Sequence, residues 1–413
     1  MPGSPAPRRP DAWPPDPVRP RRLPALAGVL WLALCLSLAL PAAGGELRRS
    51  MAFMRPLLMG DAYAAMGDEP STLFYNPAAL ATMPGGAVEA FTPQMIVDDI
   101  VFDAIVDPNK LEDEYGDLTE DDFDELIGTT LFTDVNFRMP FVTSPEAGTA
   151  WGVGLDTLAF VQILDSPLGP SLRLEYFTDL VLFRSYATKL TDRLAVGITP
   201  KLVGRLGINK VYTTGELFLS GESLSFEHDE AFQDLQDGTV FWTPGVDLGL
   251  LYALPFAESW HPRVALTALN LGGWNAGDGS RGMEFGKRPN ATAPPQAGEL
   301  PQINTFGFAV SPTYHGVRYS LAVDFVDLDR RILPGDDLYL RTRVGLEIGI
   351  AIRGDGVPLL SLLFGANATH GSFGVMSRVW IFEIGFGTYR VELGEKPGDN
   401  PDDRYGAVFG FRF

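Results

Sequence analysis

The chain has 413 residues, of which 46% are hydrophobic and 20% charged, and its formal net charge is −20 at pH 7. Nucleic acid and anionic lipid surfaces would repel so acidic a chain, so neither is predicted as a partner. The length suits one large all-β domain, and the single cysteine, Cys35, excludes an internal disulfide.

Residues 1–44 are predicted to be a leader and signal peptide. Arginines at 19–22 precede an apolar run over 26–40, and small residues follow up to Gly45. Basic, apolar and small-residue segments in this order are typical of a secretory signal, and the apolar run is short for a membrane-spanning helix. The chain is therefore expected to be exported, with removal of the signal near 43–45.

Residues 45–85 lack the alternation of a strand, and a family resemblance described below implies that they form an N-terminal hatch, which plugs a barrel. Asp68 or Ser71 is expected to cap a short helix, and Asn76-Pro77 to begin a turn or helix. The hatch is interpreted either as a static plug or as a gate that shifts to pass a ligand. The predicted hatch residues are Gly60, Asp61, Asp68, Ser71, Phe74, Tyr75, Asn76 and Pro77.

Residues 86–413 are predicted to form a transmembrane antiparallel β-barrel, because apolar residues recur with a period of two in segment after segment. In 344–352, Val, Leu and Ile alternate with Gly, Glu and Ala. The second face is rich in glycine, as expected for a lumen wall. Fourteen strands are predicted, at 86–96, 131–143, 149–163, 172–190, 194–206, 239–254, 263–272, 303–314, 317–328, 338–352, 359–368, 372–379, 381–393 and 405–413.

The connections are predicted to be short at one end of the barrel and long at the other, which is the pattern of outer-membrane barrels. Long external loops are placed at 97–130, 207–238 and 273–302.

In the strand at 131–143, Phe141 is expected on the outer, apolar face together with Phe137.

The inner faces carry charges of both signs, which would pair across strands and so lower the cost of shielding them from water. Two interpretations stay open: a salt-bridged wall that holds barrel and hatch together, and a polar path or selectivity ring. The predicted lumen residues are Asp134, Arg138, Asp156, Lys201, Arg205, Asp247, Arg318, Asp324, Arg341, Arg343, Glu347 and Glu383.

The C-terminal segment, 405–413, places Tyr405, Phe409, Phe411 and Phe413 on one face of a strand. A chain that ends on such a strand resembles the closing strand of Gram-negative outer-membrane barrels. In those proteins the barrel-assembly machinery reads this strand, so the resemblance implies that machinery and outer-membrane lipid as partners.

The sequence contains no Ser/His/Asp set, no His-Glu-x-x-His motif and no phosphate-binding glycine loop. The four histidines are scattered along the chain. Neither an enzyme nor a cofactor or metal site is predicted.

The hatch segment resembles that of the FadL-like barrel superfamily, which includes fatty-acid and hydrocarbon transporters, PorV-like proteins of a secretion system and TraF-like barrels. The chain has Ala79 where the superfamily commonly has glycine. The resemblance implies a fourteen-stranded barrel around a hatch in the bacterial outer membrane. The shared elements are Gly60, Ala62, Ala64, Asp68, Ser71, Asn76-Pro77-Ala78 and Leu80.

The resemblance implies passive transport of small hydrophobic or amphipathic compounds, similar to fatty acids or hydrocarbons. The alternative is a PorV-like secretion or assembly barrel that binds an exported protein and transports nothing itself. A general porin is disfavoured by the plug. A continuous apolar tunnel would favour transport, whereas a filled lumen with large ordered loops would favour docking.

Overall fold

The computed structural model describes the barrel and the hatch with several gaps. The predicted leader and signal peptide, including Cys35, lie outside the described residues, as does most of each predicted long loop. The described residues are 49–106, 127–165, 170–213, 240–275, 283–285, 299–330, 332–333, 338–352, 357–367, 370–393 and 401–413.

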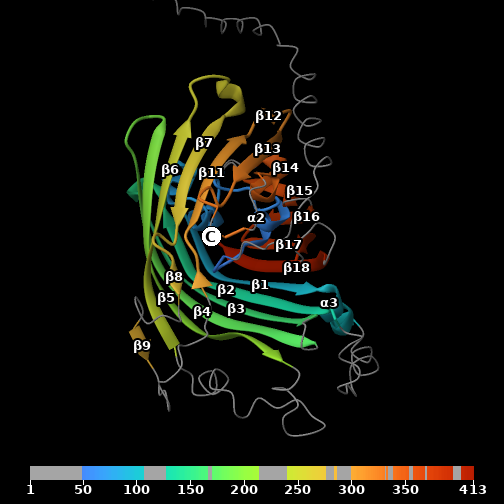
Figure 1. Cartoon of the computed structure of the whole chain (residues 1–413). Coiled ribbons are helices and arrows are strands. Elements are labelled where there is room, and N and C mark those ends of the chain that lie inside the picture. Colours follow the sequence, from blue (N-terminus) through green and yellow to red (C-terminus); the bar gives the residue numbers. More distant parts are fainter. Residues whose placement is uncertain are drawn as a thin grey trace, which may run out of the picture. The chain divides into compact units, whose positions relative to one another are not determined.

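Fourteen antiparallel strands close into a barrel (Figure 1). Consecutive strands pair, β1 pairs with β18, and the pairing of β11 with β13 completes the ring. The barrel strands are β1 (Ala87–Asp98), β2 (Thr130–Ser144), β3 (Thr149–Leu164), β4 (Ser171–Lys189), β5 (Leu194–Thr213), β6 (Val240–Ala253), β7 (Arg263–Leu269), β11 (Ile303–Val310), β13 (Val317–Phe325), β14 (Thr342–Ile352), β15 (Pro358–Asn367), β16 (His370–Val379), β17 (Phe382–Glu392) and β18 (Pro401–Arg412).

The predicted fold class is confirmed, and each predicted strand range overlaps a barrel strand. Several ranges differ in detail. The strand predicted at 194–206 continues to Thr213, into the loop predicted at 207–238. The range 303–314 divides into β11 and the short β12 (Thr313–Tyr314), because Pro312 between them has no N–H to donate to a ladder. The range 338–352 begins with a 3-10 helix, η6 (Leu338–Arg341). Of its two predicted lumen arginines, Arg341 therefore precedes the strand and Arg343 lies in it.

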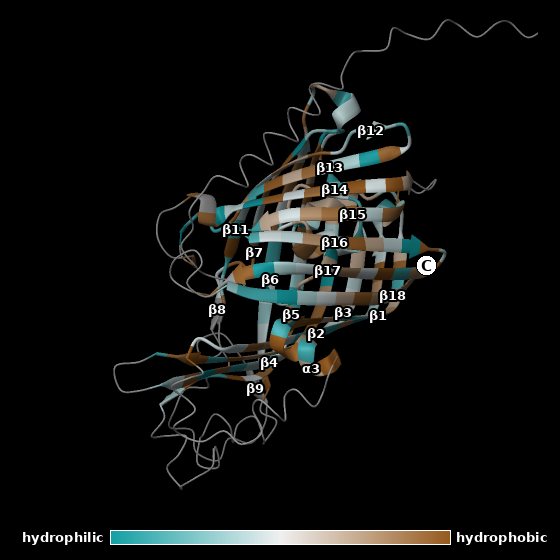
Figure 2. Ribbon diagram, turned by 90° about the vertical axis from the view of Figure 1, so that its right-hand side faces the viewer, coloured by the Kyte–Doolittle hydropathy of each residue, from teal (hydrophilic) through white to brown (hydrophobic). Residues whose placement is uncertain are grey.

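The apolar faces of the strands point outward, and the glycine-rich or charged faces point into the lumen. In β14, Leu346 is half-buried and Ile350 exposed, whereas Gly345 and Glu347 are buried. Figure 2 shows hydrophobic residues along β13 to β18, and the exposed ones include Ile350, Phe364, Phe373 and Phe409. Contiguous exposed apolar surface of this kind is rare on soluble monomers, and a lipid-facing wall explains it.

The expectation that Phe141 lies on the outer face is wrong. The register between β2 and β3 shifts between Arg138 and Phe141, which marks a β-bulge. The extra residue turns the side chain that follows toward the other face, and Phe141 is only 1% exposed. In the lumen its ring packs against Phe74 of the hatch and Phe183 of β4, with centroids 6.1 and 5.2 Å away.

The hatch occupies the lumen and contains three short helices, α2 (Met54–Leu58), η1 (Pro70–Phe74) and η2 (Pro77–Thr82). Helix α2 contacts β15 to β18, and η2 contacts β4 to β6, so the hatch bridges two separate parts of the wall (Figure 1). Most of its side chains are buried. Among the described residues, no helix has the length and apolar character needed to cross a membrane.

Glycines on the inner face let the hatch backbone lie directly on the wall. A Cβ at Gly365 of β15 would lie 2.0 Å from the backbone nitrogen of Gly60, and a Cβ at Gly249 of β6 would lie 2.0 Å from Oδ1 of Asn76. Gly60 itself has a φ of 62°, in the left-handed region that favours glycine. The glycine-rich faces of the strands are thus the surface on which the hatch rests.

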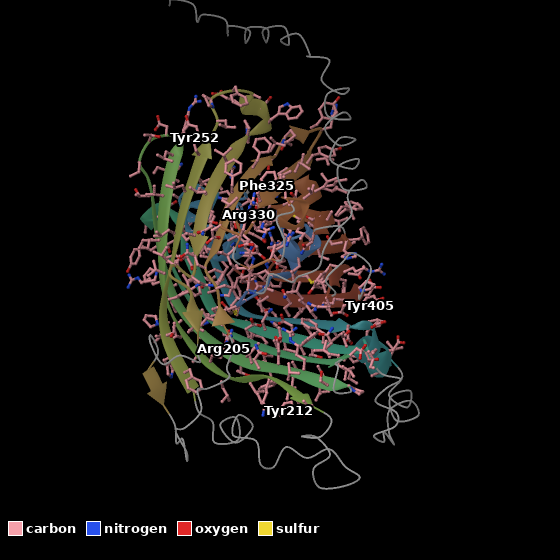
Figure 3. All side chains as sticks on the ribbon, in the orientation of Figure 1. Arg205, Tyr212, Tyr252, Phe325, Arg330 and Tyr405 are labelled. Atoms are coloured by element: carbon pink, nitrogen blue, oxygen red, sulfur yellow. The ribbon has the colours of Figure 1, made fainter. Side chains whose placement is uncertain are left out.

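Short connections gather at one end of the barrel, called here the short-turn end, and long ones at the long-loop end. Tyr252 and Tyr212 lie toward these two ends in Figure 3. The short turns include η4 (Pro145–Ala147) and η5 (Glu258–Trp260). The described pieces at the long-loop end are α3 (Asp99–Val106), β8 (Trp274–Asn275), β9 (Met283–Phe285) and β10 (Glu299–Leu300).

Replacing Gly365 by alanine is expected to unseat the hatch, because the new methyl group would overlap the backbone of residues 59–60. We expect chymotrypsin to cleave the purified barrel after Tyr63, which is fully buried in the wild type. The cleavage rate is read by mass spectrometry. Gly371→Ala on β16 is the control, because nothing lies within 4 Å of a Cβ there. Equal cleavage of the two variants would contradict the prediction.

Candidate functional site

Arg55 of α2 is the centre of an ion-pair network between hatch and wall. Its guanidinium donates to the two carboxylate oxygens of Asp68 at 3.0 and 2.8 Å. It also lies 3.3 Å from Oε2 of Glu69, and it pairs with Glu347 of β14. Three carboxylates therefore surround one guanidinium that is 3% exposed.

The same hatch carboxylates bind arginines of the wall. Asp68 accepts a hydrogen bond of 2.8 Å from Arg318 of β13, and Glu69 pairs with Arg378 of β16. Arg378 pairs in turn with Glu383 of β17. Four arginines and four carboxylates make up this network: Arg55, Arg318, Arg378, Arg412, Asp68, Glu69, Glu347 and Glu383.

Both hatch carboxylates of the network are ionised at neutral pH. Burial opposes the ionisation of Asp68, but Arg55 and Arg318 outweigh it and hold its pKa below the ordinary 3.8. Burial likewise opposes ionisation of Glu69, and the arginines led by Arg378 hold its pKa well below 4.5. Burial raises the pKa of Tyr63, whose hydroxyl therefore keeps its proton and donates to Glu69 at 2.9 Å.

The expectation that Asp68 or Ser71 caps a helix is wrong. Glu69 occupies the N-cap position of η1 without a capping side-chain bond, and the Ser71 hydroxyl donates to Glu69 instead. The cap is Asn76, whose Oδ1 accepts a bond of 3.0 Å from the backbone N–H two residues on. The predicted helix start at Asn76-Pro77 is confirmed, since η2 begins at Pro77.

A second contact between hatch and wall lies around Asp61 and Asp324. Oδ2 of Asp324, on β13, accepts hydrogen bonds of 2.6 and 2.7 Å from the backbone N–H groups of residues 63–64. Asp61 accepts a bond of 2.8 Å from the Tyr75 hydroxyl and pairs with Arg49 at 3.2 Å. The Arg49 guanidinium also lies 4.6 Å from the centre of the Tyr75 ring.

The predicted lumen residues fall into several clusters. Arg318, Asp324, Glu347 and Glu383 belong to the hatch contacts described above. Asp134 is buried in β2, Asp156 accepts the backbone N–H of Met51 at 2.8 Å, and Arg343 donates to the carbonyl of Leu340. The remaining residues form the pairs Arg138–Glu89, Lys201–Asp247, Arg205–Asp179 and Arg341–Asp327.

A cavity of about 430 Å³ lies on the long-loop side of the hatch, between Arg49 and strands β3 to β5. Two of its cationic groups are neutralised within the wall: Arg205 binds Asp179 through two bonds of 2.6 Å, and Arg173 pairs with Glu175. Arg205 lies between the barrel centre and Tyr212 in Figure 3. The apolar part of the lining comprises Leu158, Phe160, Phe177, Leu300, Pro301, Ile332 and Leu393.

Two further cavities, of about 280 and 330 Å³, lie at the short-turn end. Asp68 and Pro84 of the hatch line both of them. The smaller is also lined by Trp380 and the C-terminal Phe413, and the larger by Arg263. The hatch therefore lies between one cavity toward the long loops and two toward the short turns.

Sequence reasoning missed Arg55 and Glu69, which are central to the network. They lie in a segment without periodicity, so no pattern marked them. Asp179 had a usable signal, because it alternates in phase with the inward positions of its strand. It pairs in register with Asp156 on one side and with Arg205 on the other, both of which were predicted lumen residues.

Within the described ranges, no group of three or more His, Cys, Asp or Glu side chains is arranged to hold a metal ion. The acidic side chains of the lumen that do meet are held mainly by arginines and backbone N–H groups. Some of these contacts join the hatch to the wall, as Asp68–Arg318 does, and others lie within the wall, as Asp179–Arg205 does.

The chain matches no protein-family model and no curated protein. Solved structures similar to it include the Ralstonia pickettii toluene transporter TbuX, with 12% identity, a TM-score of 0.47 and coverage of 87% of this chain and 97% of that one. The Pseudomonas putida toluene transporter TodX has 13% identity and a TM-score of 0.45, with coverage of 88% of this chain and 98% of that one. A Pseudomonas aeruginosa FadL homologue has 10% identity and a TM-score of 0.42, with coverage of 89% of this chain and 99% of that one. These are likenesses of fold alone.

Substituting Arg55 by glutamine is expected to destabilise the seated hatch by about 3–5 kcal/mol, because removal of one partner leaves buried charges uncompensated. Hydrogen exchange of hatch amides in the native barrel measures the free energy of opening. Arg193→Gln is the control, because Arg193 and Glu258 form an exposed pair at 3.3 Å, worth below about 1 kcal/mol. If the free energy of hatch opening were equal in the two variants, Arg55 would not be the centre of the ion-pair network.

Proposed function

We propose that this chain is an outer-membrane β-barrel that passively passes small hydrophobic or amphipathic compounds, and that the hatch is its gate. One observation carries the proposal: the hatch separates cavities at the two ends, yet it is not part of the strand ladder. Among the described residues, no backbone–backbone hydrogen bond joins residues 51–83 to the wall. Side-chain contacts hold the hatch, so it can be released without breaking the barrel.

The chemistry of the long-loop cavity supports this ligand class. Its apolar side chains offer surface to a hydrophobic body, and the pairs Arg205–Asp179 and Arg173–Glu175 offer polar atoms without adding net charge. A cavity of about 430 Å³ has the size of a small-molecule site. A neutral or weakly polar compound fits such a lining better than an ion does.

The apolar outer face of the barrel supports the proposal that the protein lies in a lipid bilayer, with lipid in contact with its wall. Tyr405 and Phe409 of β18 point outward, and the Phe409 ring lies 6.1 Å from that of Phe382. A signal peptide over 1–44 and recognition of 405–413 by the barrel-assembly machinery are parts of the same proposal.

Deleting Phe413 is expected to lower the fraction of chain that assembles in the outer membrane. Its backbone exchanges two hydrogen bonds of 2.9 Å with Val88, and these hold the last residue to β1. Heat-modifiable mobility of membrane fractions measures the assembled fraction, with Phe256→Ala in an exposed turn as the control. Equal assembly of the wild type and the Phe413 deletion would argue against this role.

A second function has its own supporting observation. The hatch side chains at the lumen centre, such as Leu58, Met59 and Ala62, are fully buried. A lumen filled in this way suits a PorV-like barrel that binds an exported protein through its loops and transports nothing itself. The loops that would make such contacts are predicted at 97–130 and 207–238, and most of each lies outside the described residues.

A disulfide that locks the hatch to the wall separates the two functions. Cγ of Met51 lies 3.5 Å from the place of a Cβ at Gly154, so Met51→Cys with Gly154→Cys brings two thiols within bonding reach. Residue 51 would then be tied to β3 while the other end of the hatch continues into β1. The expected signal-peptide removal takes Cys35 away, which leaves the mature chain without a competing thiol.

For a transporter with a moving hatch, we expect the oxidised double variant to take up labelled toluene or fatty acid at least tenfold more slowly than after reduction. Uptake is measured in cells whose outer membrane limits entry, with each single-cysteine variant as a control. Uptake by the double variant that is the same in the oxidised and reduced states would contradict a moving hatch. Wild-type uptake that is the same as in cells lacking the barrel would favour docking over transport.

A further inference from the structure

Arg263 is a charged residue that the hatch network leaves aside. It is the first residue of β7, and its side chain lines the cavity of about 330 Å³ at the short-turn end. The side chain is half-buried and reaches the hatch, because Nη1 lies 2.9 Å from the place of a Cβ at Gly67. Arg263 therefore lies between the wall and the hatch, at the edge of an open space.

The neighbouring charges are already balanced among themselves. The network pairs four arginines with four carboxylates, and Asp68, which also lines this cavity, is held by Arg55 and Arg318. Among the described residues, no hydrogen bond or ion pair engages the Arg263 guanidinium. Arg263 is thus the excess cation of this region, and a shielded charge of this kind favours a counterion.

We propose that the cavity around Arg263 is a binding site for a small oxyanion, a carboxylate or phosphate group. A guanidinium offers parallel N–H donors that match two oxygens of such a group. Ser311 and Thr313 of the wall bring hydroxyls to the same cavity. The hatch closes the other side of the cavity, where the Thr82 hydroxyl donates to the carbonyl of Ala79 at 3.0 Å.

The remaining lining fits an anion that carries a short apolar part. Ala65, Met66 and Ala309 supply apolar surface on the inner side of the cavity. His261 and Thr313 are exposed, so the cavity opens to solution at the short-turn end. Burial and the nearby Arg263 lower the pKa of His261, so this ring is neutral near pH 7 and the positive charge of the site is that of Arg263.

The site does not require that the barrel transport anything, so it stands or falls separately from the proposed function. The oxyanion has two sources with the same chemistry, a soluble amphipathic carboxylate and the phosphate of a lipid headgroup. The experiment therefore includes one arm for each source.

The test measures binding of hexanoate and of inorganic phosphate to the full mature barrel in neutral-lipid nanodiscs by titration calorimetry. We expect saturable binding of at least one probe, and roughly tenfold or greater weakening in Arg263→Gln, since a charge-assisted hydrogen bond is lost. Arg263→Lys should bind with intermediate affinity. Arg184→Gln, which removes an exposed arginine of β4, is the control and should bind as the wild type does.

Heat-modifiable mobility of each variant shows that it is folded, and Arg263→Lys keeps the test valid if Arg263→Gln does not assemble. Nanodiscs that contain phosphatidylglycerol then separate the sources. Weaker apparent probe binding there assigns the site to a lipid phosphate, and unchanged binding assigns it to a soluble anion. Absence of saturable binding of both probes, or equal affinity of Arg263→Gln and the wild type, overturns the proposal.

Discussion

A ring of fourteen strands encloses a lumen too wide for wall side chains alone to fill, and the rest of the structure depends on this constraint. The hatch supplies the missing volume, but it brings its own polar backbone and charges into a space shielded from water. Each of those groups then needs a partner, because an unpaired buried charge costs several kcal/mol. The network around Arg55 is the consequence, and within it hatch and wall together contribute four arginines and four carboxylates.

The same constraint explains the glycines of the inner face. If the inner face carried larger side chains at these positions, they would keep the hatch backbone away from the wall. Glycines such as Gly365 and Gly249 avoid this separation, so the two backbones touch and the ion pairs close at short range. Small residues and charged residues therefore have complementary roles: the former bring the surfaces together, and the latter fix where the hatch lies along the wall.

The fold was predictable from the sequence because strands that face lipid on one side and a lumen on the other have a strict period of two. The prediction failed at Phe141 because a bulge adds one residue, and Pro140, which lies inside the bulge, was the sequence signal that could have marked it. The site was less predictable. Asp324 and Glu347 lie in phase within strands and were found, whereas Arg55 and Glu69 lie in an irregular segment whose geometry depends on the wall around it. Contacts across more than 250 residues have no local signature.

These contacts join residues that lie far apart in the sequence, and this separation bears on the order of folding. Arg55 meets Glu347, and Glu69 meets Arg378, at separations of 292 and 309 residues. Arg318 and Arg378, the wall partners of Asp68 and Glu69, lie on β13 and β16, so these contacts can close only when the C-terminal part of the wall is in place. Closing such long loops is slow relative to local pairing. Seating of the hatch is therefore a late event, and a barrel whose final strands were misregistered would be left with an unsealed pore.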